Sequence, residues 1–158
     1  MRALAPLLVI VPLTAVACGG SAARSPSSTT RPPPSMSSYV AAGNKVCIEA
    51  DRRIFEIGPL SRDPKGWAKT AAAARLAIAQ MRKVTPAPQR HATFDAMLRA
   101  ARSLIRAIER VHGALVRSDI DDAAAAQRTA AHLQNRVHRA ARAAGLTFCQ
   151  QALTNWPA

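Results

Sequence analysis

The stretch QRHATFDAMLRAARSLIRAIERVHGALVR, residues 89–117, carries the most regular apolar pattern of the chain. Its apolar residues recur at spacings of three or four, the period of an α-helix that buries one face. We therefore predict one long helix whose apolar face packs against other helices. The residues of that face are Phe94, Leu98, Ala101, Ile105, Ile108, Val111 and Leu115.

Two segments before this stretch show the same helical period. The first runs from about Ser38 to Ile57 and is stopped by Gly58-Pro59. The second opens with Asp63-Pro64, an N-cap residue followed by proline at the first helical position. It ends at residues 85–88, TPAP, because proline disfavours helix in the residue before it.

A fourth segment follows the long stretch. It has Ser118 or Asp119 as its cap and an alanine-rich apolar face that continues to Ala144. Gly145 stands where a left-handed helix cap belongs, and Leu146 is placed to fold back on the helix. Four amphipathic helices with short connections predict an all-α fold, an up-down-up-down antiparallel four-helix bundle.

Composition agrees with a single helical domain. The chain has 158 residues, of which 49% are hydrophobic and 4% aromatic. The hydrophobic content is too high for a wholly disordered protein, and the length suits one domain. Few aromatic and β-branched residues argue against an all-β fold.

Residues 1–17 have the features of a lipoprotein signal peptide. Residues 3–17 are uncharged and mostly apolar, and as a helix they would rise about 22 Å, less than a bilayer core. The sequence LTAVAC at residues 13–18 resembles the lipobox of bacterial lipoproteins. That resemblance implies cleavage before Cys18 and attachment of a lipid with acyl chains such as palmitate to its sulfur. The alternative is an ordinary signal peptide cut after Ala17, which leaves Cys18 free.

The rest of the chain divides into a tether and a domain. Residues 18–37 are rich in Ser, Pro and Gly, a composition typical of a disordered linker. We expect them to hold the helical domain, residues 38–158, at the outer face of the cytoplasmic membrane. The membrane, reached through the anchor on Cys18, is thus the first predicted partner.

Two cysteines remain if lipid occupies Cys18. Export places Cys47 and Cys149 in an oxidising compartment, where such a pair tends to form a disulfide. In an up-down bundle the first helix begins at the end where the fourth finishes, so a short tail folding back brings the two together. We favour a structural disulfide over a redox-active or metal-binding pair, because the two are not in a C-x-x-C motif.

The sequence holds no recognisable catalytic or metal motif. The histidines, His91, His112, His132 and His138, include no pair at the spacing that puts two ligands on one helix face. A glycine-rich phosphate loop, G-x-S-x-G and H-E-x-x-H are absent from the sequence, as are paired carboxylates with a catalytic spacing. We therefore predict no enzyme activity, no metal and no cofactor.

Basic residues are the remaining feature, with 22 Lys and Arg against 9 Asp and Glu and a net charge of +13. Two rows of arginines on the third and fourth helices could form one cationic surface. In an exported protein such a surface would meet anionic lipid or a wall polymer rather than nucleic acid. The plainer interpretation is a solvated face in an Arg- and Ala-rich proteome. The candidate anion-binding residues are Arg99, Arg102, Arg106, Arg110, Arg136 and Arg139.

The opening YVAAGNKVCIEA at residues 39–50 and the closing GLTFC at residues 145–149 resemble small Ala/Arg-rich helical lipoproteins exported by high-GC actinobacteria. The resemblance implies export, a helical fold and pairing of the two cysteines, and it transfers no catalytic residue. The sequence thus predicts a lipid-anchored envelope protein that acts as a binding or scaffold module. Its ligand and any protein partner are not identified, and the alternative is a polyanion-binding protein that uses the arginine rows.

Overall fold

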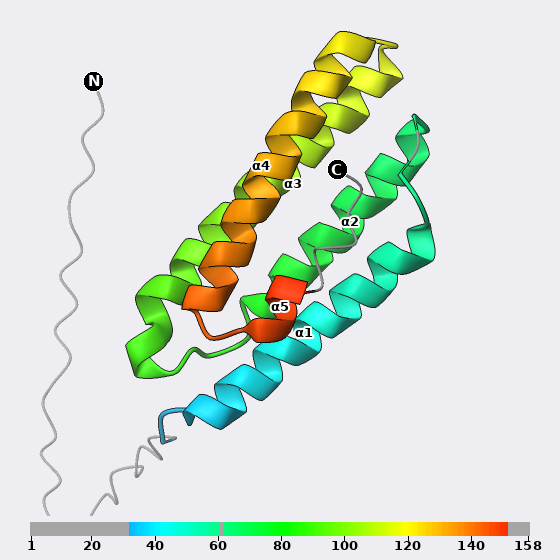
Figure 1. The fold of residues 1–158 in the computed structure, drawn as a ribbon. Helices are drawn as coiled ribbons and strands as arrows, with labels where there is room; N and C mark the ends of the chain where they lie inside the picture. Colours follow the sequence, from blue (N-terminus) through cyan, green and yellow to red (C-terminus); the bar gives the residue numbers. More distant parts are fainter. Residues whose placement is uncertain (1–31, 61, 152–158) are drawn as a thin grey trace, which may run out of the picture. The chain divides into compact units, whose positions relative to one another are not determined.

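A computed structural model describes residues 32–60 and 62–151, and this part of the chain is all-helical, without a strand (Figure 1). Four long helices pack together: α1 (Met36–Ile57), α2 (Pro64–Met81), α3 (His91–Val116) and α4 (Ile120–Ala143). A 3₁₀ turn, η1 (Pro88–Arg90), precedes α3, and a short helix, α5 (Thr147–Gln151), follows α4. The predicted all-α class is confirmed. The predicted signal peptide, Cys18 and most of the tether lie outside the described residues.

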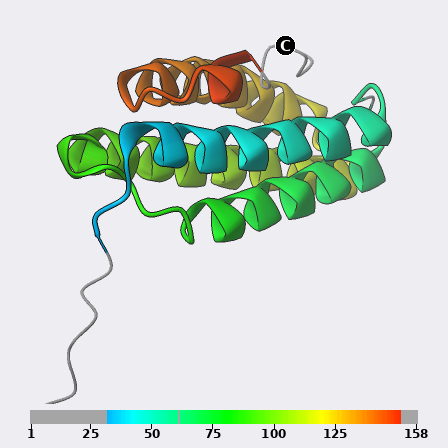
Figure 2. The same cartoon turned by 90° about the horizontal axis from the view of Figure 1, so that it is seen from below.

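The helices contact one another in sequence order. α1 packs against α2, α2 against α3, and α3 against α4. Within the described residues, no Cα of α1 comes within 8 Å of a Cα of α4. α5 contacts both of these helices, and Figure 2 shows it beside the end of α4 and over α1. α5 therefore provides one of the links between the first and last long helices.

Helix starts follow the predicted caps, with small shifts. The Asp63 carboxylate accepts a hydrogen bond from the Lys65 backbone N–H at 3.0 Å, and Asp119 does the same for Asp122 at 3.0 Å. Asp119, rather than Ser118, is thus the N-cap of α4. α1 begins two residues before the predicted Ser38, because Ser35 caps it. The regular part of α3 begins after the predicted Gln89, because residues 88–90 wind as a 3₁₀ turn.

The end of α4 forms the predicted left-handed cap. Gly145 has a φ of 79°, a conformation that glycine adopts without steric cost. Its N–H donates to the Arg142 carbonyl, and the Leu146 N–H donates to the Ala141 carbonyl, both at 2.9 Å. This is the hydrogen-bond pattern of a Schellman motif, and Leu146 folds back into full burial. The turn directs the chain into α5.

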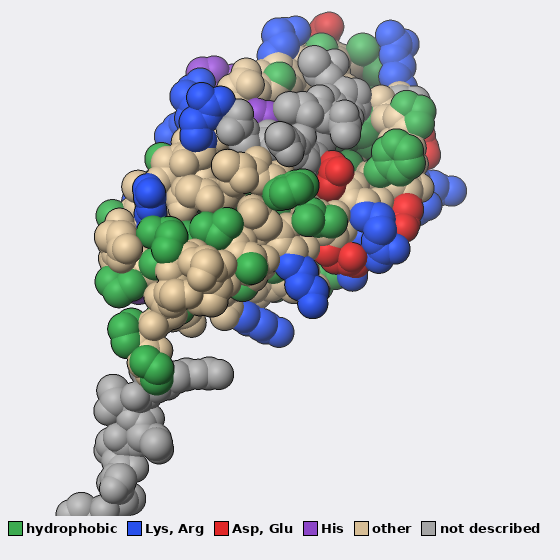
Figure 3. All heavy atoms as spheres, turned by 60° about the horizontal axis from the view of Figure 1, so that its bottom comes forward, with side chains coloured by type: hydrophobic (Ala, Val, Ile, Leu, Met, Phe, Trp, Pro, Cys, Tyr) green, Lys and Arg blue, Asp and Glu red, His purple; other side chains and the backbone are tan. Residues whose placement is uncertain are grey.

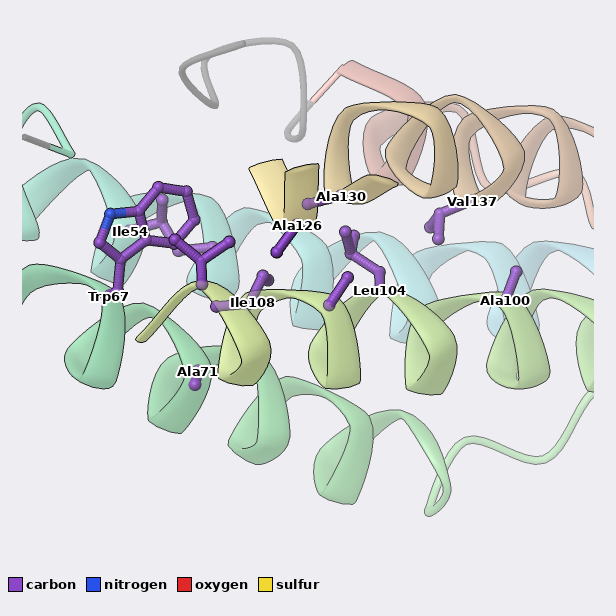
Figure 4. Close-up of a cluster of buried hydrophobic side chains, with 11 residues drawn as sticks. Ile54, Trp67, Ala71, Ala100, Leu104, Ile108, Ala126, Ala130 and Val137 are labelled. Carbon is purple, nitrogen blue, oxygen red and sulfur yellow. The ribbon is translucent and has the colours of Figure 1, made fainter. Parts of the chain in front are cut away.

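The core consists of two clusters of buried side chains. The first joins all four long helices: Figure 4 shows Trp67 of α2 beside Ile54 of α1, and the small Ala126 and Ala130 of α4 facing α3. Small residues at a helix contact let two helices approach closely. The second cluster surrounds Tyr39 and Leu146, where the start of α1 meets the end of α4.

A disulfide between Cys47 of α1 and Cys149 of α5 joins the two ends of the domain across 102 residues. The predicted pairing is confirmed. The predicted return of the tail along the domain is also found, although residues 147–151 form a short helix. The disulfide fixes α5 to α1.

Candidate anion-binding groove and apolar cavity

The described residues offer no candidate metal centre. No group of three or more His, Cys, Asp or Glu side chains among them is close enough together to hold a metal ion. Within the same residues, every helix is too short or too polar to cross a bilayer. The side chains that remain as candidates for binding are the arginines and those lining the cavity between the helices.

Arg110, one of the predicted anion-binding residues, is already paired inside the protein. Its Nε donates to Asp122 Oδ1 of α4 at 2.9 Å, and Arg117 donates to the other oxygen of Asp122 at 3.2 Å. The hydrogen bond and the charge of Asp122 raise the pKa of the Arg110 guanidinium above its usual value. Arg110 therefore connects α3 to α4, and the Asp122 carboxylate partly compensates its positive charge.

The other three predicted arginines of α3 project into solvent. Arg99, Arg102 and Arg106 are exposed, and none of them forms an ion pair with a carboxylate of the described residues. Within the described residues, the Arg106 guanidinium donates to the Ser103 hydroxyl, at 3.0 Å. These guanidinium groups keep the hydrogen-bond donors that an anion needs.

Two of these arginines line a surface groove of about 300 Å³ between α2 and α3. Arg102 and Arg106 line it from α3, Arg75 lines it from α2, and Arg82 lines it as the C-cap residue of α2. Arg75 donates to Glu109 at 2.9 Å, so its charge is compensated. Three guanidinium groups without a carboxylate partner in the described residues therefore border one groove. Its apolar lining is made of Ile78, Ala79 and Ile105.

The arginines of α2 and its C-cap were not among the predicted anion-binding residues. Arg75 and Arg82 are seven residues apart, two helical turns, and therefore share a face. This spacing could have predicted a second pair of arginines on one helix face. The sequence does not show, however, which helix lies beside Arg102.

Arg136 and Arg139, the predicted arginines of α4, are exposed and do not line this groove. On the face in Figure 3, the Lys and Arg side chains lie in separate groups rather than in one continuous area. At this site the structure thus brings arginines of α3 together with those of α2, not with those of α4.

An apolar cavity of about 100 Å³, partly open to solvent, lies among the long helices. Alanines from three helices make up part of its wall, and Val137 and Cys149 line it from α4 and α5. Asp51 of α1 is the one charged side chain that lines it in the described residues. Partial burial raises the pKa of this carboxyl group, since desolvation disfavours the charged form.

No protein-family model, no curated protein and no solved structure matches this chain. Its function has to be derived from the groove, the cavity and the sequence features before the domain. The groove has arginines that can contact an anion, and the cavity has an apolar lining that can contact an apolar group.

Proposed function

We propose that this protein is a non-enzymatic binding module, anchored by lipid on Cys18 at the outer face of the cytoplasmic membrane, that binds phosphate-bearing anions. The anions are headgroups of anionic lipid or segments of a wall polymer. One observation carries the binding part of this proposal: Arg82, Arg102 and Arg106 border one groove and have no carboxylate partner among the described residues. The anchor is supported by the lipobox-like residues 13–18.

Arginine is suited to this task. Its planar guanidinium donates two parallel hydrogen bonds to a phosphate and stays charged at every physiological pH. A basic residue close to an anionic membrane adds about 1 kcal/mol of attraction, which salt weakens. We expect binding to weaken as ionic strength rises.

We also propose that the four long helices run in the up-down-up-down antiparallel order of a four-helix bundle. The short connections and the disulfide from α1 to α5 support this order, because it brings the start of α1 to the end of α4. In this arrangement α2 and α3 are neighbours along their length, which gives the groove between them two rigid walls.

Scaffolding of a protein partner is the second candidate function. Phe55 and Ile48 of α1 are 78% and 50% exposed and lie seven residues apart, on one face of the helix. Exposed aromatic and aliphatic side chains are typical contact residues of protein interfaces. Chemical crosslinking in membranes separates the candidates: Phe55→Ser removes a specific crosslink if this face holds a partner, and leaves anion binding unchanged.

Thermal unfolding of the full chain in neutral detergent tests anion binding, with inorganic polyphosphate as the probe. A ligand that binds only the folded state raises the melting temperature. At one hundred times its Kd it adds about 2.7 kcal/mol to the free energy of unfolding. We expect this rise in the wild type and its loss in Arg82→Gln/Arg102→Gln. Arg136→Gln/Arg139→Gln, with the same change of charge, should keep it. Equal shifts in all three proteins would refute the groove as the site.

Intact mass spectrometry of the protein from the membrane fraction, without reduction, tests the anchor. We expect the mass of residues 18–158 plus lipid, less the two hydrogens lost in the disulfide. An unlipidated mass in the culture fluid would show a freely secreted protein instead.

A further inference from the structure

The arginine groove and the apolar cavity adjoin. Ile78 of α2 and Ile105 of α3 line both of them, so the two spaces lie against the same two side chains. On the outer side lie Arg82, Arg102 and Arg106. On the inner side lie only apolar side chains and Asp51. A cationic groove is thus placed next to an apolar cavity that is partly open to solvent.

Small, half-buried residues on three helices leave room for this cavity. Ala50 of α1, Ala74 and Ala77 of α2 and Ala101 of α3 all line it. A space of about 100 Å³ has room for more than one water molecule, since about 10–15 Å³ is enough for one. An engineered apolar cavity of about 150 Å³ stays dry and binds benzene or xenon. The present cavity therefore suits a somewhat smaller apolar group, such as part of an alkyl chain.

Charge fixes the direction in which a ligand with an anionic end would bind. Asp51 lines the cavity from α1, whereas Arg82 and Arg102 lie at the groove between α2 and α3. A negative headgroup is repelled by a partly buried carboxylate and attracted by the guanidinium groups. The anion therefore belongs in the groove, and the apolar part of the same molecule belongs in the cavity.

We propose that the groove and the cavity form one site for a single alkyl or acyl chain that carries an anionic headgroup. The headgroup contacts Arg82, Arg102 and Arg106, and the chain passes between Ile78 and Ile105 into the cavity. The part of this proposal that concerns the headgroup rests on the proposed function, anion binding in the groove. A free inorganic anion would use only the groove, and an uncharged alkane would use only the cavity.

A chain-length series tests the proposal. The full chain, held in phosphatidylcholine nanodiscs, is titrated calorimetrically with ethyl, hexyl and octyl phosphate, and the heat of empty nanodiscs is subtracted. Each methylene group that enters the cavity contributes about 0.8 kcal/mol, which is roughly fourfold in affinity. We expect hexyl phosphate to bind at least tenfold more tightly than ethyl phosphate, with a smaller gain to octyl phosphate once the cavity is full.

Two sets of variants locate each half of the ligand. Ala101→Leu fills the cavity and should reduce the affinity for hexyl phosphate to that for ethyl phosphate, leaving ethyl phosphate unchanged. Ala77→Leu is the second cavity-filling variant if the first fails to fold, and Ala72→Leu, at an exposed position of α2, is the matched control. Arg82→Gln/Arg102→Gln should weaken all three alkyl phosphates.

The outcomes separate the two proposals. Equal affinities for ethyl and hexyl phosphate would overturn the chain site and leave the anion groove standing. A chain-length effect that survives both cavity-filling variants would also overturn it, because the chain would then bind elsewhere. Hexanol binding as tightly as hexyl phosphate would overturn the headgroup half. Absence of binding by every phosphate would overturn the proposed function itself, and this inference with it.

Discussion

The buried hydroxyl group of Tyr39 connects the start of α1 to Ala144, the C-cap residue of α4. The side chain is 1% exposed, and its hydroxyl donates to the Ala144 carbonyl at 3.0 Å. Its ring meets Phe94 edge to face, with centroids 5.8 Å apart. Burial raises the pKa of the Tyr39 hydroxyl, so the group stays protonated and remains a donor.

Tyr39→Phe should lower the free energy of unfolding by about 1–2 kcal/mol. The substitution keeps the ring but leaves the Ala144 carbonyl without this donor in a buried place. Urea denaturation of the wild type and the variant measures the difference. An unchanged midpoint would show that the hydrogen bond does not hold the end of α4 to α1.

His138 should make the protein less stable in mild acid. Burial lowers the pKa of its imidazole, and its buried Nε2 has no hydrogen-bond partner in the described residues. Between the lowered pKa and the usual value near 6.5, the unfolded chain binds a proton that the folded protein does not. Stability therefore falls as the pH drops below about 6.5.

Urea denaturation across this pH range checks the His138 prediction. His138→Gln should reduce the loss of stability in acid, and His91→Gln, at an exposed position, should leave the wild-type loss in place. The prediction is contradicted if both variants follow the wild-type curve.

At the scale of elements, the contact between α1 and the turn after α4 depends on Gly43. A Cβ atom built on Gly43 would lie 2.6 Å from Cδ2 of Leu146, which is itself fully buried. A glycine inside a helix normally costs about 0.8–1 kcal/mol relative to alanine. At this position the close approach of Leu146 makes the glycine necessary.

Gly43→Ala should destabilise the protein by about 1–2 kcal/mol, because crowding in a packed core outweighs the gain in helix propensity. Gly113→Ala in α3 is the control, since its Cβ would meet only the flexible end of Arg117, at 3.4 Å. That variant should gain about 0.5–1 kcal/mol. Denaturation midpoints that move in the same direction for both variants would contradict the account of the α1 contact.

The helices themselves were predictable from the sequence because their signals are local. Asp63-Pro64 and Gly145 mark helix ends by their own chemistry, and the apolar period marks the buried faces. The five residues of α5 are too few to show a period, so the sequence indicated only a returning tail. Local patterns therefore gave the elements but not every connection between them.

The candidate site was predictable only in part, because it depends on which helices are neighbours. The sequence indicated Arg102 and Arg106 as an exposed row, but the arginines that share their groove, Arg75 and Arg82, come from α2 and its C-cap rather than from α4. The cavity arises where alanines of separate helices meet, which no single segment reveals. Both features are products of packing between helices.

For the molecule as a whole, the disulfide should supply much of the stability. In the chain-entropy model, a bridge that closes a loop of about 100 residues contributes about 4.7 kcal/mol. That is comparable to the net stability of many small domains. Cys47→Ala/Cys149→Ala should therefore unfold at a much lower urea concentration than the wild type. A loss below about 1 kcal/mol would show that helix packing alone holds α5 and α1 together.

The central claim is that the face between α2 and α3 binds anions. Hydrogen–deuterium exchange of the full chain, with and without polyphosphate, tests it most directly because it locates the bound anion without a substitution. We predict slower amide exchange at residues 75–82 and 99–106, with residues 136–139 unchanged. Protection confined to residues 136–139, or none anywhere in the domain, would contradict the claim.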